Sequence, residues 1–204
     1  MLLLLLPPLR LLLLPATTTP AATPGTRRIA PLLPLLLDYE PTRLSQVFCN
    51  EKKITDKVHR LLERERFRVG LLHGGKSQDQ REASLAAFRT GDINVLVATD
   101  VAGRGLDIPN VSHVINYNMS KKIDAYCHRI GRTGRAGKSG VATTLLCDDD
   151  SEVFWDLNAY LVSTAAAVPR ELANHAMTRH APGSRDDQGR LYADIAAKKK
   201  RLNG

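Results

Sequence analysis

Short apolar runs and polar clusters alternate along the central part of the chain, and their spacing predicts alternating strands and helices. Continuous apolar runs bounded by polar residues indicate buried strands, whereas the i, i+4, i+7, i+8 spacing of Ile54, Val58, Leu61 and Leu62 indicates an amphipathic helix. Strands are therefore expected at 44–49, 67–72, 95–98, 111–115 and 141–146. Helices are expected at 32–37 (interrupted by Pro34), 54–62, 83–88, 123–132 and 151–161.

The predicted strands are continuously apolar rather than alternating, which is typical of a parallel sheet covered by helices on both faces. The sequence thus predicts a single α/β domain. In such sheets, binding residues gather in the loops at the carboxyl ends of the strands. The polar clusters follow the strands in this way, at residues 50, 73–76, 99–107 and 116–118.

The two ends of the chain differ in composition from the central part. Residues 1–26 are rich in Leu and Pro, and prolines 7, 8 and 15 keep every apolar run shorter than a membrane helix requires. We expect a disordered leader at 1–26, a folded domain at 27–163 and a flexible basic tail at 164–204, with no membrane segment. A mitochondrial transit peptide is an alternative interpretation of residues 1–26, because this segment contains no acidic residue.

Composition narrows the choice of partners. The 204 residues carry a formal net charge of +8, which favours a polyanionic partner. The chain has three cysteines, Cys49, Cys127 and Cys147, whose spacing is neither paired nor metal-like, so free thiols and no metal site are expected.

An arginine cluster carries the strongest functional signal. Arg129, Arg132 and Arg135 are spaced three apart, with His128 beside the first. Positions three apart share a helix face, and guanidinium groups suit phosphate or carboxylate oxygens. A solvated basic helix face is the alternative. The glycines between these arginines argue against it, because each costs a helix roughly 1 kcal/mol relative to Ala.

The segment from His128 to Arg135, His-Arg-Ile-Gly-Arg-Thr-Gly-Arg, resembles the last motif of DEAD-box RNA helicases. The resemblance implies that the domain is the second of two RecA-like domains and faces ATP bound on the first. It also implies that Arg132 and Arg135 are arginine fingers on the transferred phosphate. By the same resemblance, His128 and Arg129 meet the acidic and Ser/Thr motifs of the partner domain.

A second segment, 98–107, resembles the motif of this family that touches both ligands. The resemblance implies that Thr99 contacts an RNA phosphate and that Gly105 and Asp107 lie near the ribose and phosphates of ATP. It places Arg104 at the cleft between the domains. Taken alone, the segment also fits an ordinary glycine-rich loop between a strand and a helix.

Two further segments resemble the RNA-binding side of the family. Gly74, Gln78 and Arg81 lie where the family holds the RNA backbone, and Asn50 follows a strand that resembles the first motif of this domain. The alternatives are a surface arginine on an ordinary helix start and an asparagine that caps a turn. Contacts to phosphate and sugar do not read base sequence, so sequence-independent RNA binding is expected.

Three further segments, 73–82, 118–124 and 169–175, most resemble the spliceosomal members of the family that act at the 5′ splice site. This resemblance implies a nuclear protein of pre-mRNA splicing with spliceosomal partners. Cytoplasmic and mitochondrial locations are the alternatives.

The sequence contains neither the Gly-x-x-x-x-Gly-Lys-[Ser/Thr] phosphate loop nor Asp-Glu-Ala-Asp. These motifs belong to the first domain, which holds ATP and Mg²⁺ in the family. We therefore expect this polypeptide alone to be inactive. A non-catalytic RNA-binding or competitor module is the alternative.

Overall fold

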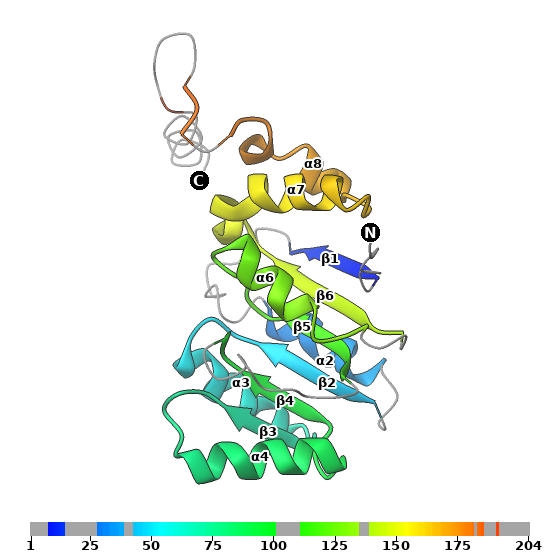
Figure 1. The fold of residues 1–204 in the computed structure, drawn as a ribbon, viewed down its shortest axis with the longest axis vertical. Coiled ribbons are helices and arrows are strands. Elements are labelled where there is room, and N and C mark those ends of the chain that lie inside the picture. The colour runs from blue at the N-terminus through cyan, green and yellow to red at the C-terminus, as the bar shows by residue number, and fades with distance from the viewer. Residues whose placement is uncertain are drawn as a thin grey trace, which may run out of the picture.

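A parallel sheet with the strand order β1-β6-β5-β2-β4-β3 forms the centre of the molecule (Figure 1). This computed structural model describes residues 8–14, 28–38, 43–100, 111–134, 139–181, 183–185 and 191. The strands are β1 (Leu9–Leu13), β2 (Leu44–Phe48), β3 (Val69–Leu72), β4 (Val95–Ala98), β5 (Val111–Asn116) and β6 (Val141–Leu146). The helices are α2 (Ile29–Leu37), α3 (Lys52–Arg64), α4 (Gln78–Thr90), α6 (Ile123–Ile130), α7 (Phe154–Ser163) and α8 (Arg170–Ala173), with 3₁₀ turns η1 (Asp148–Val153) and η2 (Ala176–Thr178).

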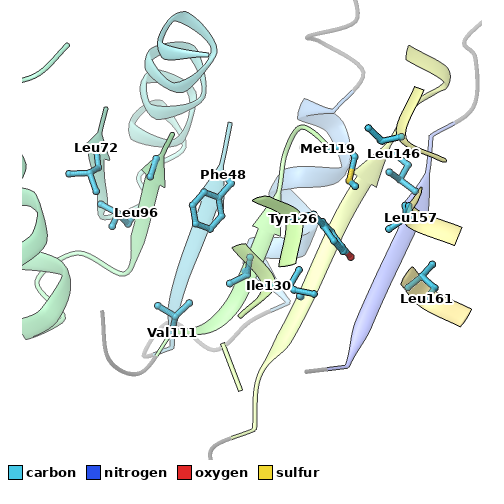
Figure 2. Packing of buried hydrophobic residues seen from close by; sticks show 14 of the residues in the cluster. Phe48, Leu72, Leu96, Val111, Met119, Tyr126, Ile130, Leu146, Leu157 and Leu161 are labelled. Carbon is cyan, nitrogen blue, oxygen red and sulfur yellow. The ribbon is translucent and has the colours of Figure 1, made fainter. Parts of the chain in front are cut away.

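Helices cover both faces of this sheet. On one face, α4, α6, α7 and α8 pack on a core that includes Phe88, Tyr126, Ile130, Leu157 and Leu172, part of which is shown in Figure 2. On the other face, α2 and α3 contribute a second core. The predicted α/β architecture, with a parallel sheet between two helical layers, is confirmed.

Local sequence explains why the helices start and stop where they do. Ser77 caps α4 by accepting a hydrogen bond from the Gln80 backbone N–H, and the Gln80 side chain accepts one from the Ser77 N–H in return. Gly91 ends the same helix with φ at +83°, a conformation that glycine adopts without steric cost. Pro34 lies inside α2 and removes one helical hydrogen bond, yet the burial of Leu32 and Leu36 keeps this helix on the sheet.

Strand β1 departs from the expectation of a disordered leader. Leu9 to Leu13 pair in parallel with residues 142–146 of β6, and Pro8 and Leu14 extend the ladder through bonds to Ala142 and Leu146. Prolines 7, 8 and 15, which limit the length of the apolar runs, lie outside the strand. Pro8 lacks an N–H, but its carbonyl accepts the Ala142 N–H at 3.0 Å. The strand forms because it covers the edge of β6 and packs Leu9, Leu11 and Leu13 on the core.

The start of the predicted flexible tail is also ordered against the domain. Leu172 of α8 is fully buried, and His175 makes an edge-on ring contact with Phe154 at 4.8 Å. The hydroxyl of Thr178 donates to the carbonyl of His175 at 2.7 Å. The domain therefore extends through η2. Most of residues 182–204, including the basic run at 198–201, lie outside the described residues.

Within the described ranges, every helix is too short or too polar to span a lipid bilayer. No group of three or more His, Cys, Asp or Glu side chains in these ranges is arranged to hold a metal ion.

Candidate functional site

The polar residues that follow four adjacent strands lie along one edge of the sheet. The order β5, β2, β4, β3 places Asn116, Asn50, Thr99 and His73 at successive carboxyl ends. Backbone hydrogen bonds join the neighbouring strand ends. The N–H groups of Tyr117, Cys49 and Thr99 donate to the carbonyl oxygens of Phe48, Ala98 and Leu72, respectively. The sequence predicted this gathering of polar clusters, and the structure shows it.

Arg129 of α6 lies at the centre of this edge and is only 1% exposed. Its Nε and one terminal nitrogen donate to the two carboxylate oxygens of Asp100 at 2.6 and 2.8 Å. The same terminal nitrogen donates to the Asn50 side-chain oxygen at 2.7 Å. The other terminal nitrogen donates to the Asn118 carbonyl at 2.7 Å and makes a longer bond of 3.5 Å to the Asn116 side chain.

These contacts engage every N–H direction of the Arg129 guanidinium, which has five donors. The group also lies 5.4 Å from the centre of the Phe48 ring, a cation–π distance. The family resemblance assigned Arg129 to contacts with a partner domain. The structure gives it partners inside its own domain, and we infer that it holds the ends of β5, β2 and β4 in register.

Asn50 uses its side-chain amide within the same network. Its oxygen accepts from Arg129, and its nitrogen donates to the Met119 carbonyl at 2.8 Å. Its backbone N–H donates to the Asn118 side chain at 3.3 Å. This arrangement matches the turn-capping alternative considered for Asn50, whereas an RNA contact by this residue stays a prediction.

His128 and Arg132 lie on either side of the buried Arg129 in sequence but are more accessible. His128 is exposed and Arg132 is half-buried. Helix α6 ends at Ile130, and the Arg132 N–H donates to the Arg129 carbonyl at 3.0 Å in the turn that follows. The anchored Arg129 therefore fixes the start of the segment that carries Arg132. A half-buried guanidinium on a fixed turn suits the phosphate or carboxylate oxygens of a ligand.

Thr133 anchors the far side of this turn, because its hydroxyl donates to the buried Val111 carbonyl at 2.7 Å. Gly140 packs so closely on Thr133 that a side chain at position 140 would collide with it. Four residues predicted to contact ATP, the domain cleft or the transferred phosphate lie outside the described residues: Arg104, Gly105, Asp107 and Arg135. Their roles stay predictions.

The other predicted RNA-binding residues that the structure describes follow β3 and β4 or lie in the first turns of α4: Gly74, Thr99, Gln78 and Arg81. The Arg81 guanidinium donates to the Gln78 side-chain oxygen at 3.0 Å, so these two residues share one helix face, as their spacing predicted. Gly74 and Gln78 are exposed. Thr99 is 6% exposed at the end of β4, directly before the Asp100 that binds Arg129.

None of the three cysteines is in a disulfide. Burial raises the pKa of the Cys49 thiol to about 12, although the nearby Arg129 charge opposes this shift. Burial likewise raises the pKa of Cys127. These thiols are therefore protonated near neutral pH and are unsuited to nucleophilic chemistry.

Comparison with known proteins identifies the family of this chain. Residues 28–137 match the model of the helicase conserved C-terminal domain. The chain belongs to this family. It is 55% identical over 142 residues to the DEAD-box ATP-dependent RNA helicase 21 of Oryza sativa, covering 70% of this chain and 19% of the relative. It is 49% identical over 146 residues to the pre-mRNA-splicing ATP-dependent RNA helicase prp28 of Emericella nidulans, covering 71% of this chain and 18% of the relative.

A solved structure shows the same fold. The RNA-helicase Prp28 from Chaetomium thermophilum, crystallised with ADP, superposes with a TM-score of 0.72 and 41% identity, covering 84% of this chain and 40% of that chain. The domain is thus the RecA-like C-terminal domain of DEAD-box RNA helicases, as the motifs indicated. It spans about a fifth of the length of the curated relatives it matches.

Sequence reasoning missed Asp100 and Asn118 as the partners of Arg129. Both lie inside polar clusters that the sequence analysis recognised, at 99–107 and 116–118. Because a buried charge needs a partner, the acidic residue in the first of these clusters was a signal that could have identified Asp100 as the counter-charge of an arginine. It also missed Asp56, whose carboxylate lies 3.2 Å from His73. No sequence pattern links these two residues, because they belong to different elements.

Proposed function

We propose that this domain is the C-terminal half of an ATP-dependent RNA helicase and supplies Arg132 and Arg135 to a nucleotide held by another RecA-like domain. The observation that carries the proposal is the buried Arg129, which ties three strand ends together and anchors the turn bearing Arg132. When ATP is bound, its terminal phosphoryl group is the one transferred to water. A positioned guanidinium stabilises the charge on that group, an effect worth about 10³–10⁵ in rate in phosphoryl-transfer enzymes.

RNA binding is proposed on the same edge of the sheet. Gly74, Gln78 and Arg81 would hold phosphates and sugars of the RNA backbone, with Thr99 on the neighbouring strand. Because β2 and β4 end in the Arg129 network, this residue connects the proposed RNA side to the proposed nucleotide side. Such a connection offers a physical route by which bound RNA stimulates ATP hydrolysis.

The test is a chimera in which this chain follows the first RecA-like domain of its rice relative. We expect RNA-stimulated ATP hydrolysis by the chimera, a loss of roughly 10³-fold on Arg132→Ala, and no turnover by the isolated chain. Arg64→Ala is the matched control, because Arg64 is an exposed arginine at the end of α3. If Arg132→Ala and Arg64→Ala lower the rate equally, the arginine-finger role is refuted.

We further propose a nuclear role in pre-mRNA splicing, supported by the name of the Emericella relative, whose identity with this chain is 49%. Magnesium would be held by the first domain, since the acidic and phosphate-loop motifs are not in this sequence. Purification of the tagged protein from nuclei checks the splicing role. Enrichment of spliceosomal small nuclear RNAs is expected, and their absence from the eluate would contradict it.

A further inference from the structure

The turn that joins β3 to α4 is held by a buried histidine. His73 is 4% exposed, and its Nδ1 accepts the Gly75 backbone N–H at 3.0 Å. Since Nδ1 acts as an acceptor, the ring proton lies on Nε2, which donates to the Asp56 carboxylate of α3 at 3.2 Å. The His73 carbonyl also accepts the Lys76 N–H at 3.1 Å. The imidazole thus links this turn to helix α3.

Gly74 lies at the exposed tip of this turn, and Lys52 of α3 lies beside it. A side-chain carbon built on Gly74 would be 3.8 Å from Cε and 3.9 Å from Nζ of Lys52. In the part of the chain that the structure describes, neither the Gly74 N–H nor the Lys52 ammonium has a hydrogen-bond or ion-pair partner. Lys76 differs, because its ammonium lies 3.7 Å from the Asp56 carboxylate.

An unpaired backbone N–H beside an unpaired ammonium is a suitable site for one phosphate group. The absence of a side chain on Gly74 allows a ligand to approach the backbone closely. The ammonium supplies the charge that a phosphate requires. The Asp56 carboxylate, which would repel an anion, accepts a hydrogen bond from His73 and lies 3.7 Å from the Lys76 ammonium, whose positive charge offsets it.

We propose that Lys52 and the Gly74 amide together bind one phosphate of a single-stranded RNA, and that His73 and Asp56 are positioning residues for this subsite. The inference rests on the proposed RNA-binding function and extends it to residues of α3. Because the contact is made to phosphate, it contributes affinity without selecting a base sequence.

The test measures binding of a fluorescent oligouridylate to the 204-residue chain as a function of salt. Loss of one phosphate contact to single-stranded nucleic acid lowers the slope of log K against log salt by about 0.7. We expect this change, with several-fold weaker binding at low salt, for Lys52→Ala. Lys57→Ala is the control, because Lys57 is an exposed lysine elsewhere on α3, and its slope should equal that of the unaltered chain. Equal slopes for all three proteins would overturn the proposal.

The positioning role has its own readout. His73→Leu removes both hydrogen bonds, whereas His73→Asn keeps a side-chain acceptor for the Gly75 N–H. We expect His73→Leu to weaken binding as much as Lys52→Ala does, the double variant to be no weaker than either, and His73→Asn to restore part of the affinity. Additive losses would show that His73 does not act through this subsite.

Failure of this inference can be separated from failure of the proposed function. If the unaltered chain binds RNA and Arg81→Ala weakens binding while Lys52→Ala does not, only the Lys52 subsite is refuted. If the unaltered chain binds no RNA at low salt, both the subsite and the proposed RNA-binding function are refuted. Thermal unfolding of each variant verifies that it is folded before its affinity is compared.

Discussion

Arg129 carries a positive charge although its side chain is almost completely buried. The free energy of unfolding of the domain therefore depends on the groups that pair with this guanidinium. Replacement by Met would leave Asp100 without a counter-charge and Asn50 and Asn118 without a donor. Breaking a buried pair costs about 3–5 kcal/mol, and the 29% exposure of the Asp100 side chain reduces this to roughly 2–4 kcal/mol. Urea unfolding of Arg129→Met checks the value. His128→Ala, at the exposed neighbour, should change stability by less than about 0.5 kcal/mol; similar losses in both variants would contradict the network.

The sequence could predict that these residues form a cluster but not which of them turns inward. Positions three apart suggested that Arg129, Arg132 and Arg135 present one surface to an anion. In the structure, the Asp100 carboxylate supplies the anion for Arg129 from within the domain. A spacing rule describes one helix and carries no information about a loop that approaches from another strand. The burial of Arg129 is therefore a tertiary property.

Substitutions in strand β1 can test whether residues 9–13 belong to the folded domain. Leu11 packs on the core, whereas its neighbour Leu12 is 38% exposed, which makes the two positions a matched pair. We expect Leu11→Asp to lower the free energy of unfolding by about 2 kcal/mol, because it removes apolar burial and desolvates a carboxylate. Leu12→Asp should have little effect. Chemical denaturation of both variants measures the two changes in the free energy of unfolding. Equally small changes would mean that residues 9–13 do not pack against β6 and the core.

The elements that the sequence predicted well are those whose signal is local. The strands at 95–98 and 141–146 are confirmed to the residue, and α4 ends at the glycine that was expected to stop it. Strand β1 was missed because its hydrogen bonds are made to β6, about 130 residues along the chain, and a Leu-rich segment between prolines has no distinctive period. The ordering of α8 was missed because only Leu172 anchors it deeply.

At the scale of the whole molecule, one buried histidine makes unfolding depend on pH. His113 of β5 is 1% exposed, and its Nε2 lies 2.9 Å from the Thr143 hydroxyl of β6. Burial, together with the charge of Arg10 on β1, lowers the pKa of His113 to about 4. The unfolded chain has an ordinary histidine pKa near 6.5. Between these values the unfolded state binds a proton that the folded state does not, so stability falls as pH falls through this window.

The expected loss from His113 is about 2 kcal/mol on lowering the pH from 7 to 5. Other groups titrate over the same range, so the informative quantity is the difference between the unaltered chain and His113→Gln. Glutamine retains a polar group for Thr143 but has no proton to gain. Urea unfolding at several pH values should therefore give a shallower profile for His113→Gln, even if its stability at pH 7 is lower. Parallel profiles would show that His113 is accessible to protons in the folded state, and that the β5–β6 region of the sheet is less tightly closed than its burial indicates.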